Sequence, residues 1–147
     1  MQSTWRRPRD NELYGRAASR TIRAVRTVGM RIFNEYSRRL SATIMFFSPE
    51  TCDGEGGNFE LMGWWNINPG GNALVYANDL ADLNRFWYVH ARAVDGQIWE
   101  GPFVYPTVPL EAFSRCWGIA SSAGQSIPCG YREIDIGNHD NANVRIR

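Results

Sequence analysis

The spacing of apolar residues along the chain changes at Gly29. Before this glycine, apolar and small side chains recur every three or four residues from Asn11 to Val28, with arginines on the opposite side. The apolar side holds Tyr14, Ala18, Thr21, Val25 and Val28, and the basic side holds Arg9, Arg16, Arg20 and Arg23. This period of about 3.6 residues predicts an amphipathic helix that stops at Gly29.

After Gly29 the period shortens to two, which is typical of strands with one buried face. The alternating segments are 30–36, 42–47, 61–67, 73–77, 85–93, 97–104, 131–136 and 142–147, with turn residues at 68–71 and 95–96 and an irregular stretch at 105–130. About eight short strands at this spacing predict an all-β fold, an antiparallel β-sandwich. The sandwich covers residues 29–147 and follows a basic arm over residues 1–28. We expect hairpins between 30–36 and 42–47 and between 85–93 and 97–104.

Alternation also assigns side chains to the two faces of each strand. The apolar face of 61–67 holds Leu61, Gly63, Trp65 and Ile67, and that of 85–93 holds Trp87, Val89, Ala91 and Ala93. The opposite faces predict an outer patch of Trp64, Phe86 and Tyr88, with His90 and Arg92 at its edge. Three interpretations stay open: the N-terminal helix covers the patch, the patch stacks on a sugar ring or base, or the side chains are individually exposed.

Charge is segregated between the arm and the body. The net charge is +1, yet ten of the sixteen arginines and only three acids lie in residues 1–39, while the remainder holds six arginines and twelve acids. The candidate docking residues of the arm are Arg6, Arg7, Arg9, Arg16, Arg20 and Arg23. They form either a solvated helix face or a docking segment for a protein partner, for self-assembly, for nucleic acid or for an anionic membrane surface.

Three cysteines are too few for a disulfide scaffold. Cys116 and Cys129 flank a Gly/Ser-rich loop and are a possible disulfide, with three reduced thiols as the other interpretation. No apolar run is long enough to span a bilayer, and no hydrophobic region follows Arg6 and Arg7 as a secretory signal requires. A cytoplasmic location is therefore expected.

Residues that carry chemistry are sparse. Two acid and amide clusters offer oxygen ligands without the spacing of an EF-hand, and they are expected to be turns. They are Asp53/Glu55/Asn58 and Asp135/Asn138/Asp140/Asn141. His90 and His139 lack a partner at the spacing of a catalytic triad or a metal site, and no phosphate-binding loop occurs. The sequence therefore predicts no metal, no cofactor and no enzyme.

Five motifs follow one another along the chain in a characteristic order. They are Gly54-Glu55-Gly56-Gly57-Asn58, Gly63-Trp64-Trp65-Asn66-Ile67-Asn68-Pro69-Gly70, Phe86-Trp87-Tyr88-Val89-His90-Ala91, Asp95-Gly96 with Trp99-Glu100-Gly101, and Cys129-Gly130-Tyr131-Arg132-Glu133-Ile134-Asp135-Ile136-Gly137. This succession resembles the bacterial family catalogued as domain of unknown function 1036, over residues 30–147. The resemblance implies a compact β-rich domain without an assigned activity, so it carries over no site. The chain departs from the family pattern at Phe33, where members often have Cys, and many members are secreted.

These observations favour a non-catalytic binding or assembly module, with a rigid β body and an Arg-rich docking segment. Two alternatives stay open. The first is a domain that recognises carbohydrate or another small ligand through the aromatic patch, and the second is an unrecognised hydrolase.

Overall fold

The computed structural model describes residues 3–6, 28–53, 57–102, 106–118 and 125–147. In these residues the chain is all-β, as predicted, with twelve strands in three sheets and one helical turn, α2 (Pro49–Cys52). The predicted helix over 11–28 lies outside the described residues, as do all of the arm's candidate arginines except Arg6.

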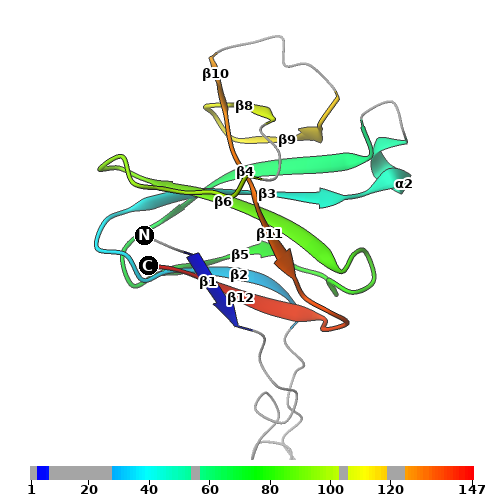
Figure 1. Ribbon diagram of the computed structural model, residues 1–147, viewed down its shortest axis with the longest axis horizontal. Helices are drawn as coiled ribbons and strands as arrows, with labels where there is room; N and C mark the ends of the chain where they lie inside the picture. Colours follow the sequence, from blue (N-terminus) through cyan, green and yellow to red (C-terminus); the bar gives the residue numbers. More distant parts are fainter. Residues whose placement is uncertain (1–2, 7–27, 54–56, 103–105, 119–124) are drawn as a thin grey trace, which may run out of the picture.

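Two large sheets form the body, and a small sheet lies above them (Figure 1). The four-stranded sheet has the order β1 (Ser3–Arg6), β12 (Asn141–Ile146), β2 (Gly29–Asn34) and β5 (Asn72–Tyr76). The six-stranded sheet has the order β11 (Arg132–Asp135), β6 (Phe86–Ala93), β3 (Leu40–Phe47), β4 (Phe59–Ile67) and β9 (Phe113–Cys116), with β7 (Ile98–Trp99) beside β6. The two-stranded sheet pairs β10 (Ser126–Pro128) with β8 (Thr107–Pro109).

The connectivity differs from the prediction in three respects. β2 and β3 lie in different large sheets, so the hairpin expected between residues 30–36 and 42–47 is wrong. β12 pairs with β2 in parallel, which departs from a purely antiparallel arrangement. The strands in the described residues also outnumber the eight expected, because β1 lies in the predicted arm and the irregular stretch 105–130 contributes β8, β9 and β10.

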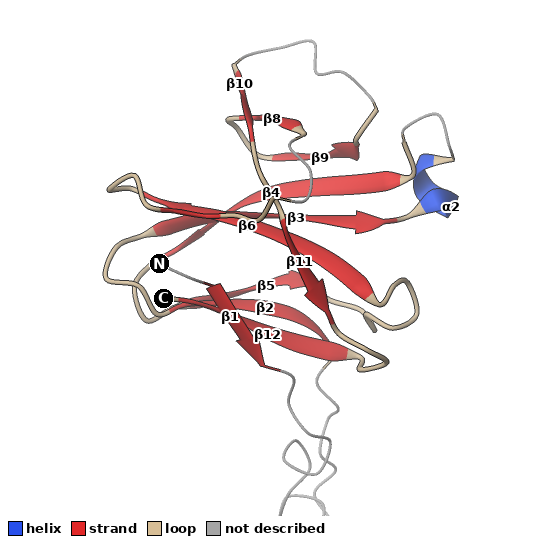
Figure 2. Ribbon diagram, viewed as in Figure 1, coloured by secondary structure: helices blue, strands red, loops and turns tan. Residues whose placement is uncertain are grey.

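The inner core lies between the two large sheets, which Figure 2 shows as two facing layers. Period-two alternation in β2, β6 and β12 sends every second side chain into it, as predicted. Its buried members include Met30, Ile32, Ile44, Phe46, Trp87, Val89, Ile134, Val144 and Ile146. Phe46 stacks on Trp87 with 4.8 Å between ring centroids, which anchors the middle of the core.

A second cluster, the outer core, lies on the opposite face of the six-stranded sheet. Its buried members are Met45, Leu61, Tyr88, Val108, Cys129 and Tyr131, with Phe59, Trp64, Phe113, Trp117 and Ile127 packed against them. Val108 and Ile127 come from β8 and β10, so the small sheet covers this face. Both faces of the six-stranded sheet are therefore buried over part of their area.

Two local features fix the ends of β2. Gly29 begins the strand at a φ of 100°, and a Cβ there would lie 2.1 Å from the carbonyl oxygen of Tyr76, so only glycine fits. At the other end, the buried amide of Asn34 donates to the carbonyl oxygens of Arg38 and Ile67, at 2.8 Å each. This amide ties the four-stranded sheet to the end of β4 and to the crossover that follows β2.

The two predicted turns are confirmed. In the first, the amide of Gly71 donates to the carbonyl oxygen of Asn68 at 2.8 Å. In the second, the amide of Gly96 donates to the carbonyl oxygen of Ala93 at 3.0 Å, and β7 then pairs with β6. The expected hairpin after residue 93 is therefore present, although its second strand is short.

Candidate functional site

A groove opens on the outer face of the six-stranded sheet. It lies beside the segment that covers the outer core, which consists of β8, β10 and their connections within residues 106–130 and is called the covering segment below. The volume of the groove is about 480 Å³, which falls in the range of small-molecule sites. The sheet contributes Ser41, Trp64, Asn66 and Arg92 to its lining, and the covering segment contributes Leu110, Glu111 and Ile127. The groove thus combines apolar walls with a few polar groups and one charge of each sign.

A bulge in β4 brings Trp64 to this groove. Ala42 pairs with Trp65 and Thr43 pairs with Gly63, so Trp64 is the extra residue between two regular pairs. Such an insertion leaves two residues opposite one and redirects a side chain. Trp64 and Trp65 consequently belong to opposite faces of the sheet, as predicted.

The same bulge corrects the rest of the face assignment in this strand. Trp65 and Ile67 pack in the inner core, as expected. Leu61 lies in the outer core and Met62 packs against the inner core, which is the reverse of strict alternation. The prediction that Leu61 shares a face with Trp65 is therefore wrong, because the extra residue shifts the parity of the strand by one.

The indole of Trp64 is fixed by contacts on two sides. Its Nε1 donates to the carbonyl oxygen of Pro109 at 2.8 Å, which ties β4 to the covering segment. Its ring lies edge-on to Phe113 and to His90, with centroid distances of 6.3 and 6.0 Å. The half-buried ring is a preformed wall of the groove.

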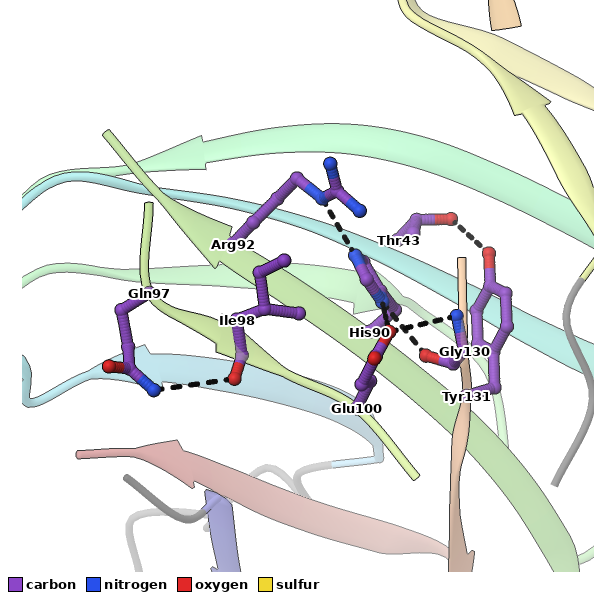
Figure 3. Close-up of polar contacts among 8 residues, drawn as sticks. All are labelled: Thr43, His90, Arg92, Gln97, Ile98, Glu100, Gly130 and Tyr131. Atoms are coloured by element: carbon purple, nitrogen blue, oxygen red, sulfur yellow. Dashed lines mark hydrogen bonds and ion pairs between the residues drawn. The ribbon is translucent and has the colours of Figure 1, made fainter. Parts of the chain in front are cut away.

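A chain of hydrogen bonds lies behind the groove and ends at Arg92 (Figure 3). Arg92 Nε donates to His90 Nε2 at 3.0 Å. A guanidinium can only donate, so Nε2 is the unprotonated acceptor and Nδ1 carries the proton. The Nδ1–H then donates to the carbonyl oxygen of Gly130 at 2.8 Å.

Burial keeps His90 in this neutral form. Its side chain is 0% exposed, and loss of solvation lowers its pKa to about 4, with the nearby Arg92 acting in the same direction. Glu100 Oε1 lies 3.7 Å from His90 Nδ1 and accepts the amide N–H of Gly130 at 3.1 Å. At neutral pH the histidine therefore serves as a hydrogen-bond link rather than as a charge.

Further polar groups are buried beneath the covering segment. Thr43 Oγ1 donates to the carbonyl oxygen of Met62 at 2.6 Å, so the hydroxyl of Tyr131 donates to Thr43 Oγ1 at 2.9 Å. Burial raises the pKa of Tyr131 and raises that of the Cys129 thiol to about 11. Both groups are protonated at neutral pH.

The five residues of the predicted outer patch are only partly brought together. Trp64 and Arg92 line the groove, and His90 lies directly behind Arg92. Tyr88 is buried in the outer core at 9% exposure, whereas Phe86 is 40% exposed with the guanidinium of Arg85 5.2 Å from its ring centroid. The expectation of one exposed patch is wrong for Tyr88 and His90, because the segment after residue 105 covers them.

The disulfide prediction is corrected by the structure. Cys52 and Cys116 form a disulfide with 5.6 Å between their Cα atoms, while Cys129 is a buried free thiol. The bond joins α2 to the end of β9, next to the edge of β4. Neither the pair Cys116–Cys129 nor a set of three reduced thiols is found.

The acidic clusters lie only partly in turns: Asp53, Asn58, Asn138 and Asp140 do, whereas Asp135 ends β11 and Asn141 begins β12. Asp53 follows α2 in the left-handed region, and Asp135 accepts both Arg85 Nε and Arg85 Nη2 at 2.8 Å. Among the described residues, no group of three or more His, Cys, Asp or Glu is arranged to hold a metal ion. Glu55 lies outside these residues.

Comparisons of the chain with family models, with curated proteins and with solved structures found no match in any of the three. The resemblance to domain of unknown function 1036 therefore stays a prediction. No helix in the described part of the chain is long and apolar enough to cross a membrane.

Several groove residues were missed by the sequence reasoning. Ser41 and Asn66 lie on neighbouring strands, where Ser41 Oγ donates to Asn66 Oδ1 at 2.7 Å. Their polar side chains in otherwise apolar strands were the available signal. Leu110, Glu111 and Ile127 had none, because they lie in the stretch that showed no period.

Proposed function

We propose that this protein is a non-catalytic recognition domain that binds a small ring-shaped polar ligand, of the carbohydrate kind, in the groove beside Trp64. The observation that carries the proposal is one preformed tryptophan wall beside a polar floor, in a groove of about 480 Å³. Sugar rings present apolar C–H faces to aromatic walls and hydroxyl groups to polar ones.

The floor of the groove supports this ligand class. Asn66 is exposed, and with Oδ1 taken by Ser41 it offers its amide N–H groups to a ligand hydroxyl. Leu110, at 49% exposure, adds an apolar rim. A largely apolar lining with few convergent polar groups is the usual composition of a small-ligand site.

The protonation states of the buried groups favour binding over catalysis. A nucleophilic thiol needs a lowered pKa, whereas the pKa of Cys129 is raised to about 11. A general base needs a pKa near the working pH and a free nitrogen, whereas the pKa of His90 is about 4 and both ring nitrogens are in hydrogen bonds. The hydrolase alternative therefore has less support.

The proposal also covers the architecture of the body, the role of the arm and the compartment. The two facing sheets support describing the body as a β-sandwich, with β1 of the predicted arm inside it and the rest of the Arg-rich arm as a docking segment for a partner or for self-assembly. The Cys52–Cys116 disulfide favours an oxidising compartment over the predicted cytoplasm, since disulfides rarely persist in reducing surroundings.

A glycan array tests the proposal. We expect the labelled wild-type chain to bind a subset of neutral and acidic glycans. Asn66→Ala and Trp64→Phe should each weaken that binding at least about fivefold, because each removes ligand contacts worth roughly 1 kcal/mol or more. Asn66 is exposed, so its variant keeps the fold.

Trp117→Phe is the matched control, because Trp117 packs against the same outer core without lining the groove. Its binding should equal that of the wild type, with circular dichroism showing that all three variants are folded. An array without any bound glycan, or variants at Trp64 and Asn66 that bind like the control, would remove the proposal.

A further inference from the structure

We propose that the groove selects ligands that carry a single carboxylate, such as a sugar acid, and that the guanidinium of Arg92 holds this carboxylate. This inference rests on the proposed function, because it names the class of ligand for the same groove. It adds a charge requirement that an aromatic wall and an amide do not impose.

Arg92 is presented to the groove as a preorganised cation. Its Nε–H is taken by His90 Nε2 at 3.0 Å (Figure 3), and its side chain lines the groove. A planar guanidinium held through Nε keeps the paired N–H groups of its outer edge for a second partner. That edge matches the two oxygens of a carboxylate.

The charge of Arg92 is not neutralised by a carboxylate in the described chain. No ion pair joins it to an acid among these residues, whereas Arg85, Arg145 and Arg147 each pair with an acidic side chain. The nearest contacts of Arg92 are with neutral groups, namely the imidazole of His90 and the thiol of Cys129. A half-buried cation with neutral neighbours favours an anionic ligand.

The support behind Arg92 is rigid. His90 is fully buried, and its second ring nitrogen is bound to the carbonyl oxygen of Gly130 at 2.8 Å. The amide of Gly130 is in turn held by Glu100 at 3.1 Å. His90 is thus a positioning residue, since it acts on the ligand only through the arginine.

The other charge in the groove limits the ligand to one negative charge. Glu111 is exposed and lines the same groove as Arg92. It repels a second anionic group and reduces the net positive charge available to a phosphate dianion. The geometry therefore favours a monoanion whose carboxylate points inward and whose ring lies against Trp64.

The test is a titration of the full chain with matched sugars at constant ionic strength. The probes are galactose, galacturonate, glucose, glucuronate, glucose 6-phosphate and acetate. Calorimetry measures the dissociation constant of each. We expect each uronate to bind at least about tenfold more tightly than its neutral partner, which is the usual gain from a hydrogen bond to a charged group. Acetate should bind weakly, because it lacks the ring.

Arg92→Gln should remove the preference for uronates, so that each uronate binds no more tightly than its neutral partner. Arg92→Lys should keep only part of the preference, because a lysine lacks the paired N–H edge. Arg31→Gln is the control, since it removes the same charge from the four-stranded sheet. On the wild-type chain, the Arg92 Nε–H signal in a ¹⁵N spectrum should shift with galacturonate and stay in place with galactose.

The outcomes separate this inference from the proposed function. Equal affinities for uronates and neutral sugars would overturn the proposed selection for a carboxylate and leave the proposed sugar-binding function in place. Tightest binding of glucose 6-phosphate would replace the carboxylate by a phosphate. Acetate binding as tightly as a uronate would support an anion site at Arg92 and contradict a role for the sugar ring. No binding of any sugar would contradict both proposals.

Discussion

The two faces of the six-stranded sheet are covered in different ways. Neighbouring residues of β3 show the contrast, since Ile44 packs in the inner core and Met45 in the outer core. The inner face meets a full second sheet and contains apolar side chains almost throughout. The outer face meets only a two-stranded sheet, and buried polar groups such as Thr43 and His90 lie there among the apolar ones.

This difference places the apolar layer that stabilises the fold on one face of the sheet and the groove on the other. An apolar layer between two sheets gains stability from burial and tolerates no polar group without a partner. The thin cover of the outer face leaves a groove at its margin, and the polar groups beside it hold Arg92 in place. We therefore expect substitutions on the inner face to affect folding most, and those on the outer face to affect the groove.

The largest expected effect is on the free energy of unfolding, and it differs between two adjacent residues of β3. Ile44→Ala should lower the free energy of unfolding by about 4 kcal/mol, and Met45→Ala by about 2 kcal/mol. Both side chains are buried, but the cover over Met45 can settle into the space left behind. Urea denaturation monitored by tryptophan fluorescence measures both values. Equal losses would show that the two cores are packed alike.

Removal of the disulfide should loosen the cover of the outer core. The bond spans 64 residues of sequence, and a loop of this size predicts a loss of about 4 kcal/mol in Cys52→Ser/Cys116→Ser. Hydrogen exchange should increase in β8, β9 and β10 more than in β2 and β12. Reductant should destabilise the wild type and leave the double variant unchanged. An equal increase in hydrogen exchange over both large sheets would contradict the view that the two faces of the six-stranded sheet are covered differently.

Acid should weaken the outer face through His90. The folded chain lowers the pKa of this residue from 6.5 to about 4, so the unfolded chain binds a proton first as the pH falls. The contribution to stability is complete above about pH 6.5 and falls by roughly 2 to 3 kcal/mol on the way to pH 4. His90→Gln should flatten this part of the pH profile of unfolding. An unchanged slope in the variant would show that other groups cause the loss.

The smallest effect concerns the hydroxyl pair behind the groove. Thr43→Val should cost about 1 to 2 kcal/mol, because the buried hydroxyl of Tyr131 loses its partner. Tyr131→Phe should cost less, since Thr43 still donates to Met62. A double-mutant cycle in urea gives the coupling between the two hydroxyls. A coupling of zero would mean that solvent replaces the bond.

The face of most strands could be predicted from alternation alone. Met30 and Ile32 in β2, and Trp87 and Val89 in β6, are buried in the inner core as the period required. The rule failed at β4, where one extra residue at Trp64 inverts the faces before it. Alternation also carries no information on partners, so the pairing of β12 with β2 could not be derived from it.

The groove could be predicted only in part. Face parity placed Trp64 and Arg92 on one side of the sheet, which is where they lie. The covering segment has no period, because its strands are three or four residues long, and its contribution was invisible. The cysteine pairing was wrong for a related reason, since closeness along the chain favoured Cys129 and the fold brings Cys52 to Cys116.

The position of β12 has a consequence for the order of events during synthesis. This strand lies between β1 and β2, and most of the chain separates it from β2. A nascent chain therefore carries Met30 and Ile32 out of the ribosome long before Ala142 and Val144 exist to pair beside them. The body closes only once residues 141–146 have emerged, and until then the apolar side chains of β2 lack the strand that pairs beside them.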